Sequence, residues 1–211
     1  MTHESRSWRS PIILVYVLIV VYIANLWGSL LADGTVFSKY FFSGVTFQLL
    51  LLLGSGIYIN IFTHTISFDS ITPDQIWNVL FFFTITVFFV FFASTAIGTS
   101  TQSSIPLVSL STLLAIVSVV LAPFSEEVFF RGLLFSDLDS EIQTVYAIVL
   151  SSLVFTGGHI LVLVEQADIS SGIASLFFVF VSGMLFAKVY SITNNILVSI
   201  VSHSVYNIIL I

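Results

Sequence analysis

The stretch Pro11–Leu31, "PIILVYVLIVVYIANLWGSLL", runs without a single Asp, Glu, Lys or Arg. An α-helix needs about 20 predominantly apolar residues to cross a bilayer core of roughly 30 Å. The stretch follows Arg6 and Arg9, as a signal peptide would, but it exceeds the apolar core of about 7–15 residues that such peptides carry. We therefore predict a retained membrane-spanning helix here.

The rest of the chain follows the same pattern. Of its 211 residues, 57% are hydrophobic and 8% are charged, and the mean hydropathy is +1.12, which soluble domains of this size do not show. We predict an all-α, polytopic transmembrane bundle of about seven helices that forms one membrane domain, 1–211. The expected spans are 11–31, 41–62, 77–98, 105–124, 145–164, 172–190 and 195–211. The fourth should remain helical past Arg131 towards Asp139, because no proline follows Pro123 there.

Charge and cysteine content exclude several classes of function. The net charge is −6, so the chain offers no basic surface for nucleic acid. It has no cysteine, which excludes disulfides, thiolate metal sites and cysteine nucleophiles. We predict a multi-pass protein of the cell membrane with the lipid bilayer as a partner. Arg6, Arg9 and Lys188 would lie on one side and Lys39 on the other, which predicts a cytoplasmic N-terminus.

Ionisable residues are distributed unevenly between the predicted helices. The first three spans contain none beyond tyrosine, so we predict that 1–104 is a scaffold. The second half, 105–211, places five ionisable residues in apolar surroundings: Glu126, Glu127, Arg131, His159 and His203. A charged side chain near the bilayer centre costs roughly 2.5–3.5 kcal/mol on insertion scales, which indicates a functional role.

Three of these residues lie in "FSEEVFFRGLL", Phe124–Leu134. At about 100° per residue, Glu127 and Arg131 lie one turn apart on one face, whereas Glu126 points about 140° away from Arg131. We predict that Arg131 pairs with Glu127. Glu126 then faces a different part of the bundle, where a carboxylate without a cationic partner can act as a general base.

Two further motifs carry polar residues at helical spacing. In "VFTGGHI", Phe155 and His159 lie one turn apart, and Gly157 and Gly158 predict a close helix approach. In "HSVYN", His203 and Asn207 also lie one turn apart and should project from one side of the last helix. Counting about 1.5 Å per residue places Glu126, His159 and His203 in the middle portion of the bilayer.

Each motif also has a structural interpretation. The charges can pin one helix to its neighbours, His159 can bond a backbone carbonyl, and His203 and Asn207 can hydrogen-bond across helices. Buried carboxylates and histidines also mark proton paths, although the chain lacks the two similar halves expected of many carriers.

Taken together, the motifs resemble the CPBP family, which comprises type II CAAX prenyl proteases and bacterial bacteriocin-processing or self-immunity proteins, also labelled Abi. The resemblance rests on E-E-x-x-x-R from Glu126 to Arg131, F-x-x-x-H from Phe155 to His159 and H-x-x-x-N from His203 to Asn207, within residues 105–211. It implies an intramembrane glutamic endopeptidase that needs no metal or other cofactor and cleaves membrane-associated peptides or proteins.

The resemblance also implies roles for individual residues. Glu126 and His159 would activate the attacking water, and His203 and Asn207 would bind the oxyanion. Glu127 and Arg131 would form the supporting ion pair. No H-E-x-x-H or G-x-S-x-G motif points to a competing protease chemistry. The alternative function is a non-catalytic immunity or membrane binding protein in which the same polar cluster grips a bacteriocin or a receptor.

Overall fold

The computed structural model describes residues 9–31, 36–62, 65–97, 116–160 and 169–210, and its elements in these ranges are helical apart from one isolated β-bridge. The chain forms seven helical rods in the described residues, as predicted. Six are single helices: α1 (Arg9–Leu31), α2 (Val36–Phe62), α3 (Pro73–Ile97), α7 (Thr144–Gly158), α9 (Ile169–Thr193) and α10 (Ile196–Leu210). The fourth in chain order is a continuous rod of η2 (Val117–Leu121), α5 (Ala122–Glu127), η3 (Val128–Phe135) and α6 (Ser136–Glu141).

Helix length and composition make this a multi-pass membrane protein. Four helices, α1, α2, α3 and α9, are long and apolar enough to cross a bilayer, and α7 and α10 are shorter apolar helices. Residues 105–115 of the predicted fourth span and 161–164 of the fifth lie outside the described residues. Exposed apolar side chains such as Tyr22, Trp77 and Phe92 suit a lipid environment.

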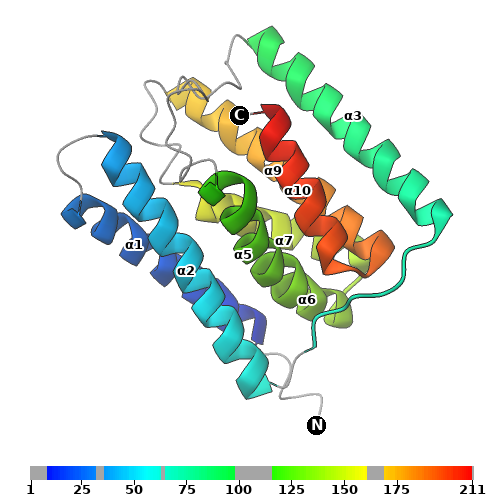
Figure 1. The fold of residues 1–211 in the computed structure, drawn as a ribbon, viewed down its shortest axis with the longest axis horizontal. Coiled ribbons are helices and arrows are strands. Elements are labelled where there is room, and N and C mark those ends of the chain that lie inside the picture. The colour runs from blue at the N-terminus through cyan, green and yellow to red at the C-terminus, as the bar shows by residue number, and fades with distance from the viewer. Residues whose placement is uncertain (1–8, 32–35, 63–64, 98–115, 161–168, 211) are drawn as a thin grey trace.

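The central rod positions the polar residues of the molecule. It contacts α2, α7, α9 and α10, and Figure 1 shows α5 between α2 and α10, with α1 packed on α2 and α3 at the outer edge. The prediction that this helix continues beyond Arg131 is confirmed, since it ends at Glu141. Glu127 and Arg131 of the rod and Ser199 of α10 are almost completely buried, so polar groups form part of the interior.

Two parts of the rod are π-helices, which have wider turns than an α-helix. In η2, the backbone N–H of Ala122 donates to the carbonyl of Val117, five residues back. The next donor in this register would be Pro123, which has no N–H. The carbonyl of Ser118 must therefore find a partner outside the rod, and one is supplied by α10, as described below.

The turn between α9 and α10 holds the last helix in place. Asn194 has a φ of 46°, a left-handed conformation that asparagine tolerates better than most residues. The segment before α3 clamps this turn: Asn195 Nδ2 donates to the carbonyl of Asp69 at 2.7 Å, and the N–H of Ile196 donates to the carbonyl of Ser67 at 3.1 Å. These bonds fix the starting point of α10, which carries two of the candidate site residues.

Candidate active site

Arg131 forms the predicted ion pair with Glu127. Its Nη1 lies 3.0 Å from Glu127 Oε1, and its Nη2 donates to the carbonyl of Gly183 in α9 at 3.0 Å. Both charged side chains are at most 1% exposed. The prediction that Arg131 pairs with Glu127 is therefore confirmed. The bond from Nη2 to the carbonyl of Gly183 links the central rod to α9.

Aromatic rings surround the guanidinium. Its Cζ lies 4.5 Å from the centroid of Phe155 and 5.4 Å from that of Phe186, within the range of cation–π attraction. The Nη1 contact with Glu127 is an ion pair without hydrogen-bond alignment, because neither Nε nor Nη1 of Arg131 has a hydrogen-bond partner among the described residues. The faces of these rings therefore stabilise the buried guanidinium, in place of further hydrogen-bond acceptors.

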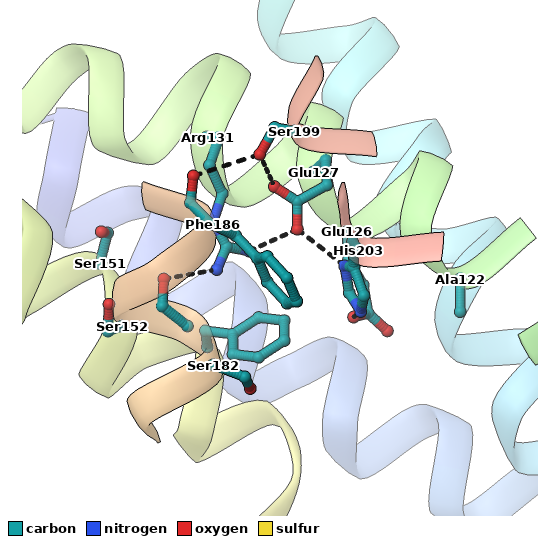
Figure 2. A network of polar contacts seen from close by, with 12 residues as sticks. Ala122, Glu126, Glu127, Arg131, Ser151, Ser152, Ser182, Phe186, Ser199 and His203 are labelled. Carbon is teal, nitrogen blue, oxygen red and sulfur yellow. Dashed lines mark hydrogen bonds and ion pairs between the residues drawn. The ribbon is translucent and has the colours of Figure 1, made fainter. Parts of the chain in front are cut away.

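Glu127 is held by two more groups, both on α10. Ser199 Oγ donates to its Oε2 at 2.6 Å, and His203 Nδ1 lies 2.8 Å from its Oε1 (Figure 2). A carboxylate paired with an arginine only accepts hydrogen bonds, so His203 must carry a proton on Nδ1. In the neutral ring, Nε2 then bears the lone pair. Glu127 therefore sets both the place and the tautomer of His203.

Glu126 faces a different set of groups, as the helical geometry predicted. Gln48 Nε2, on α2, donates to its Oε1 at 2.7 Å, and its Oε2 lies 3.9 Å from His203 Nε2. Glu126 is 4% exposed. The ring of His203 thus lies between the two neighbouring glutamates and stacks on Phe186, with 4.2 Å between ring centroids.

His159 occupies the end of α7 and not the middle of a helix, because α7 ends at Gly158. Its Nδ1 lies 2.9 Å from the carbonyl of Phe155, the bond that the structural interpretation anticipated. The Phe155 ring centroid is 4.7 Å from that of His159 and 6.1 Å from that of His203. No hydrogen bond or ion pair within the described ranges joins His159 to either glutamate, so its action on water stays a prediction.

The two glycines before His159 differ in their surroundings. A Cβ added to Gly158 would lie 3.3 Å from Phe47 Cζ, the end of a side chain of α2, so the missing side chain of Gly158 leaves room for this ring. A Cβ on Gly157 would meet no atom of the described residues within 4 Å, so no close helix approach is found there. Within the described part of the chain, Gly157 thus has no close neighbour, whereas the ring of Phe47 lies beside Gly158.

Asn207 projects from the same side of α10 as His203, as predicted, and both contact the central rod. Its Nδ2 donates at 2.8 Å to the carbonyl of Ser118, the group that Pro123 leaves without a backbone donor. This bond links α10 to η2. Since an amide nitrogen carries two N–H groups, one remains for another acceptor.

Two residues that the sequence interpretation missed, Gln48 and Ser199, contact the two glutamates of the site. Gln48 is the one strongly polar side chain in the run "VTFQLLLLL" of α2, and this isolated polarity was the signal that could have identified it. Ser199 precedes His203 by one helical turn, so helical periodicity could have placed it on the same face. Asp137, whose segment the sequence left without a role, is buried, and the Tyr58 hydroxyl donates to its carboxylate.

A family model described as "Type II CAAX prenyl endopeptidase Rce1-like" matches residues 108–209. The matched segment includes the central rod, α7, α9 and almost all of α10, and hence all six residues that the motifs had singled out. Gln48 and the rest of α1–α3 lie outside it. No curated protein and no solved structure matched the chain.

Proposed function

Through residues 108–209 the chain belongs to the Rce1-like type II CAAX prenyl endopeptidase family of intramembrane glutamyl proteases, and on this premise we propose that Glu126 is its general base. The proposal rests on the surroundings of the Glu126 carboxylate. The carboxylate of Glu126 is buried, it is not the one that Arg131 contacts in an ion pair, and its Oε2 lies 3.9 Å from His203 Nε2.

This separation suits a hydrolytic site. It is too long for a direct hydrogen bond, and one water molecule can contact both atoms at ordinary hydrogen-bond distances. Glu126 takes a proton from this water while the water oxygen attacks the carbonyl carbon of the peptide. The same proton then passes to the nitrogen of the leaving amine as the C–N bond breaks, which returns Glu126 to its starting state.

The oxyanion of the tetrahedral intermediate is assigned to His203 and Asn207. Support comes from α10, which directs both side chains towards the central rod, and from the second N–H of Asn207 Nδ2. His203 donates from Nε2 when both of its ring nitrogens carry protons. His159 is assigned to the water together with Glu126, since a proton on Nδ1 shared with the carbonyl of Phe155 leaves Nε2 as a base.

Glu127 and Arg131 have a supporting role in this proposal. Glu127 already accepts from Ser199 and His203 and contacts Arg131, so it has little capacity to bind a water molecule as well. A carboxylate held in this way orients His203 and keeps a proton on its Nδ1, whether or not Nε2 is also protonated.

The proposed substrates are membrane-associated peptides or proteins, and the proposed cellular role is bacteriocin processing or self-immunity. No metal takes part. The N-terminus is assigned to the cytoplasm, because Arg6, Arg9 and Lys188 would then lie on the cytoplasmic side.

Purified protein in liposomes tests the base directly. Membrane peptides incubated with the protein should be cleaved, and Glu126→Gln should reduce the rate by roughly 10²–10⁴-fold, the usual contribution of general acid–base catalysis. Glu141→Gln, the same change at an exposed residue at the end of the rod, is the matched control and should cleave at the wild-type rate. Loss of cleavage on addition of a chelator would contradict the metal-free mechanism.

A cellular assay separates the enzyme from the non-catalytic immunity protein. Cells exposed to a bacteriocin should lose protection when they carry Glu126→Gln, His159→Ala or His203→Ala. Unchanged protection in all three variants would support a binding protein in which the polar cluster grips its partner without hydrolysis.

A further inference from the structure

Gln48 is a buried amide that reaches the candidate base from outside the family-matched segment. It lies on α2, it is 5% exposed, and its Nε2 donates to Glu126 Oε1 at 2.7 Å. Burying a primary amide in an apolar bundle is costly unless both of its ends are hydrogen-bonded. Both ends of Gln48 are bonded, one of them to Glu126.

The other end of the amide meets Ser125, the residue just before Glu126. Gln48 Oε1 accepts from Ser125 Oγ, and the same hydroxyl lies 2.8 Å from the carbonyl of Leu121. Ser125 is completely buried. The hydroxyl also lies 3.2 Å from the carbonyl of Ala122, and since it has a single proton, at any moment Ser125 donates either to Gln48 or to a carbonyl of its own helix, of which Leu121 is the nearer.

This choice defines two complete hydrogen-bond arrangements. When Glu126 is ionised, Ser125 donates to the amide oxygen of Gln48, and the amide nitrogen donates to Glu126. When Glu126 is protonated, its O–H donates to the amide oxygen after the amide turns by 180° about Cγ–Cδ. The amide nitrogen then donates to Ser125 Oγ, whose hydroxyl turns to the carbonyl of Leu121.

We propose that Gln48 is a positioning residue that, with Ser125, forms a reversible hydrogen-bond relay holding Glu126 in place in both of its protonation states. The inference rests on the proposed function, because a general base passes through both states in every turnover. No proton leaves Glu126 along the relay. Only the amide and the hydroxyl reorient, so Oε2 keeps its place opposite His203 while the charge changes.

The surroundings of Glu126 make such a relay useful. Among the described residues, the titratable and charged groups around it are Glu127 on α5, Arg131 on η3 and His203 on α10. His159 at the end of α7 is assigned to the same water molecule as Glu126, and α2 presents the Gln48 amide. Arg131 and His203 are already engaged by Glu127. Gln48 is therefore the group that can follow a change of charge on Glu126 by turning.

The test compares kcat, KM and the pH dependence of kcat for the full-length protein in liposomes, with a membrane peptide that the wild-type protein cleaves. Gln48→Met keeps the size of the side chain and removes both hydrogen bonds. It should lower kcat about tenfold, the loss typical of one hydrogen bond, and leave KM unchanged. Ser125→Ala should lower kcat by a similar factor although, among the described residues, the Ser125 hydroxyl makes no hydrogen bond to the Glu126 carboxylate, and the double variant should lose little more.

Gln48→Glu provides a readout that a purely structural role would not move. A second carboxyl against Glu126 should shift the acid limb of the kcat–pH profile to higher pH, because neighbouring like charges favour the protonated form. This variant also keeps a polar side chain of the same length, so it carries the test if Gln48→Met does not fold. Ser55→Ala is the matched control, since Ser55 lies on α2 and donates only to its own helix, at the carbonyl of Leu51.

The outcomes distinguish this inference from the proposed function. Wild-type kcat in Gln48→Met or Ser125→Ala, or an unmoved acid limb in Gln48→Glu, would overturn the relay while an inactive Glu126→Gln keeps the general base. A fully active Glu126→Gln would overturn the general base itself.

Discussion

The two neighbouring glutamates of the central rod face two regions of the molecule that are built differently. On the Glu127 side, Arg131, Ser199 and His203 all contact one carboxylate, and aromatic rings lie over the guanidinium of Arg131. On the Glu126 side, one amide holds one oxygen and an imidazole nitrogen lies 3.9 Å from the other. The comparison teaches that residue type does not decide the role of a buried carboxylate. Its role depends on how many groups already bind it.

The largest expected effect on the free energy of unfolding comes from a change at Glu127, the glutamate with more partners. Glu127→Gln leaves the cation of Arg131 buried without a charged partner, which should destabilise the protein by about 3–5 kcal/mol. The free energy of unfolding in detergent measures this loss. Glu126→Gln is the matched change one residue earlier and should unfold close to wild type while it loses activity. Equal destabilisation of the two variants would erase the difference between the two regions.

Ser199→Ala should show the next largest effect. It removes a hydrogen bond to the ionised Glu127, and such bonds contribute about 1.5–3 kcal/mol. Ser191→Ala is the control, because Ser191 donates only within its own helix, to the carbonyl of Lys188. If both serine variants unfold alike, Ser199 does not hold Glu127.

Asn207→Leu tests how α10 is fastened to the rod. The partly buried carbonyl of Ser118 would lose its donor, which should cost about 1 kcal/mol, the lower end of the range for a buried acceptor left without a partner. Adding Pro123→Ala restores a backbone N–H in register with that carbonyl. The double variant should therefore recover part of the stability lost in Asn207→Leu, and no recovery would mean that Asn207 does not compensate for the proline.

The smallest effects on stability are expected at the end of α7, where Gly157 and Gly158 test how α7 packs beside the α2 residues near Glu126. Gly157→Ala meets no atom of the described residues within 4 Å and should be neutral or stabilising by about 0.4–1 kcal/mol. Gly158→Ala brings a methyl group against Phe47, the neighbour of Gln48, and should be destabilising. Comparing the two unfolding free energies shows whether α7 packs tightly on α2. Identical values would argue against that contact.

Much of the fold and part of the site were predictable from local patterns. Apolar runs of sufficient length predicted a multi-pass helical protein, and the one-turn spacing of Glu127 and Arg131 predicted their ion pair. The π-helical turns of the rod did not spoil this pair, since four residues still return the chain to nearly the same face. Where a prediction depended only on neighbours within one helix, it held.

Predictions that depended on contacts between helices were less complete. Gln48 lies 78 residues before Glu126, and nothing in either segment indicates that the two side chains meet. His159 was expected within the helical span 145–164, but α7 ends just before it and its Nδ1 lies at hydrogen-bond distance from the carbonyl of Phe155. Sequence spacing carries no information on where a helix stops against its neighbours.

By itself, the sequence determined that this chain is a membrane protein and that, tyrosine aside, the ionisable residues within its apolar spans lie in its second half, because hydropathy and helical periodicity are properties of consecutive residues. Tertiary structure alone decided that His203 lies between two glutamates and that α2 supplies the amide beside one of them. The physical reason is that hydrogen bonds and ion pairs act over a few ångströms in space, and only the packing of the helices brings residues so distant in the chain within that range.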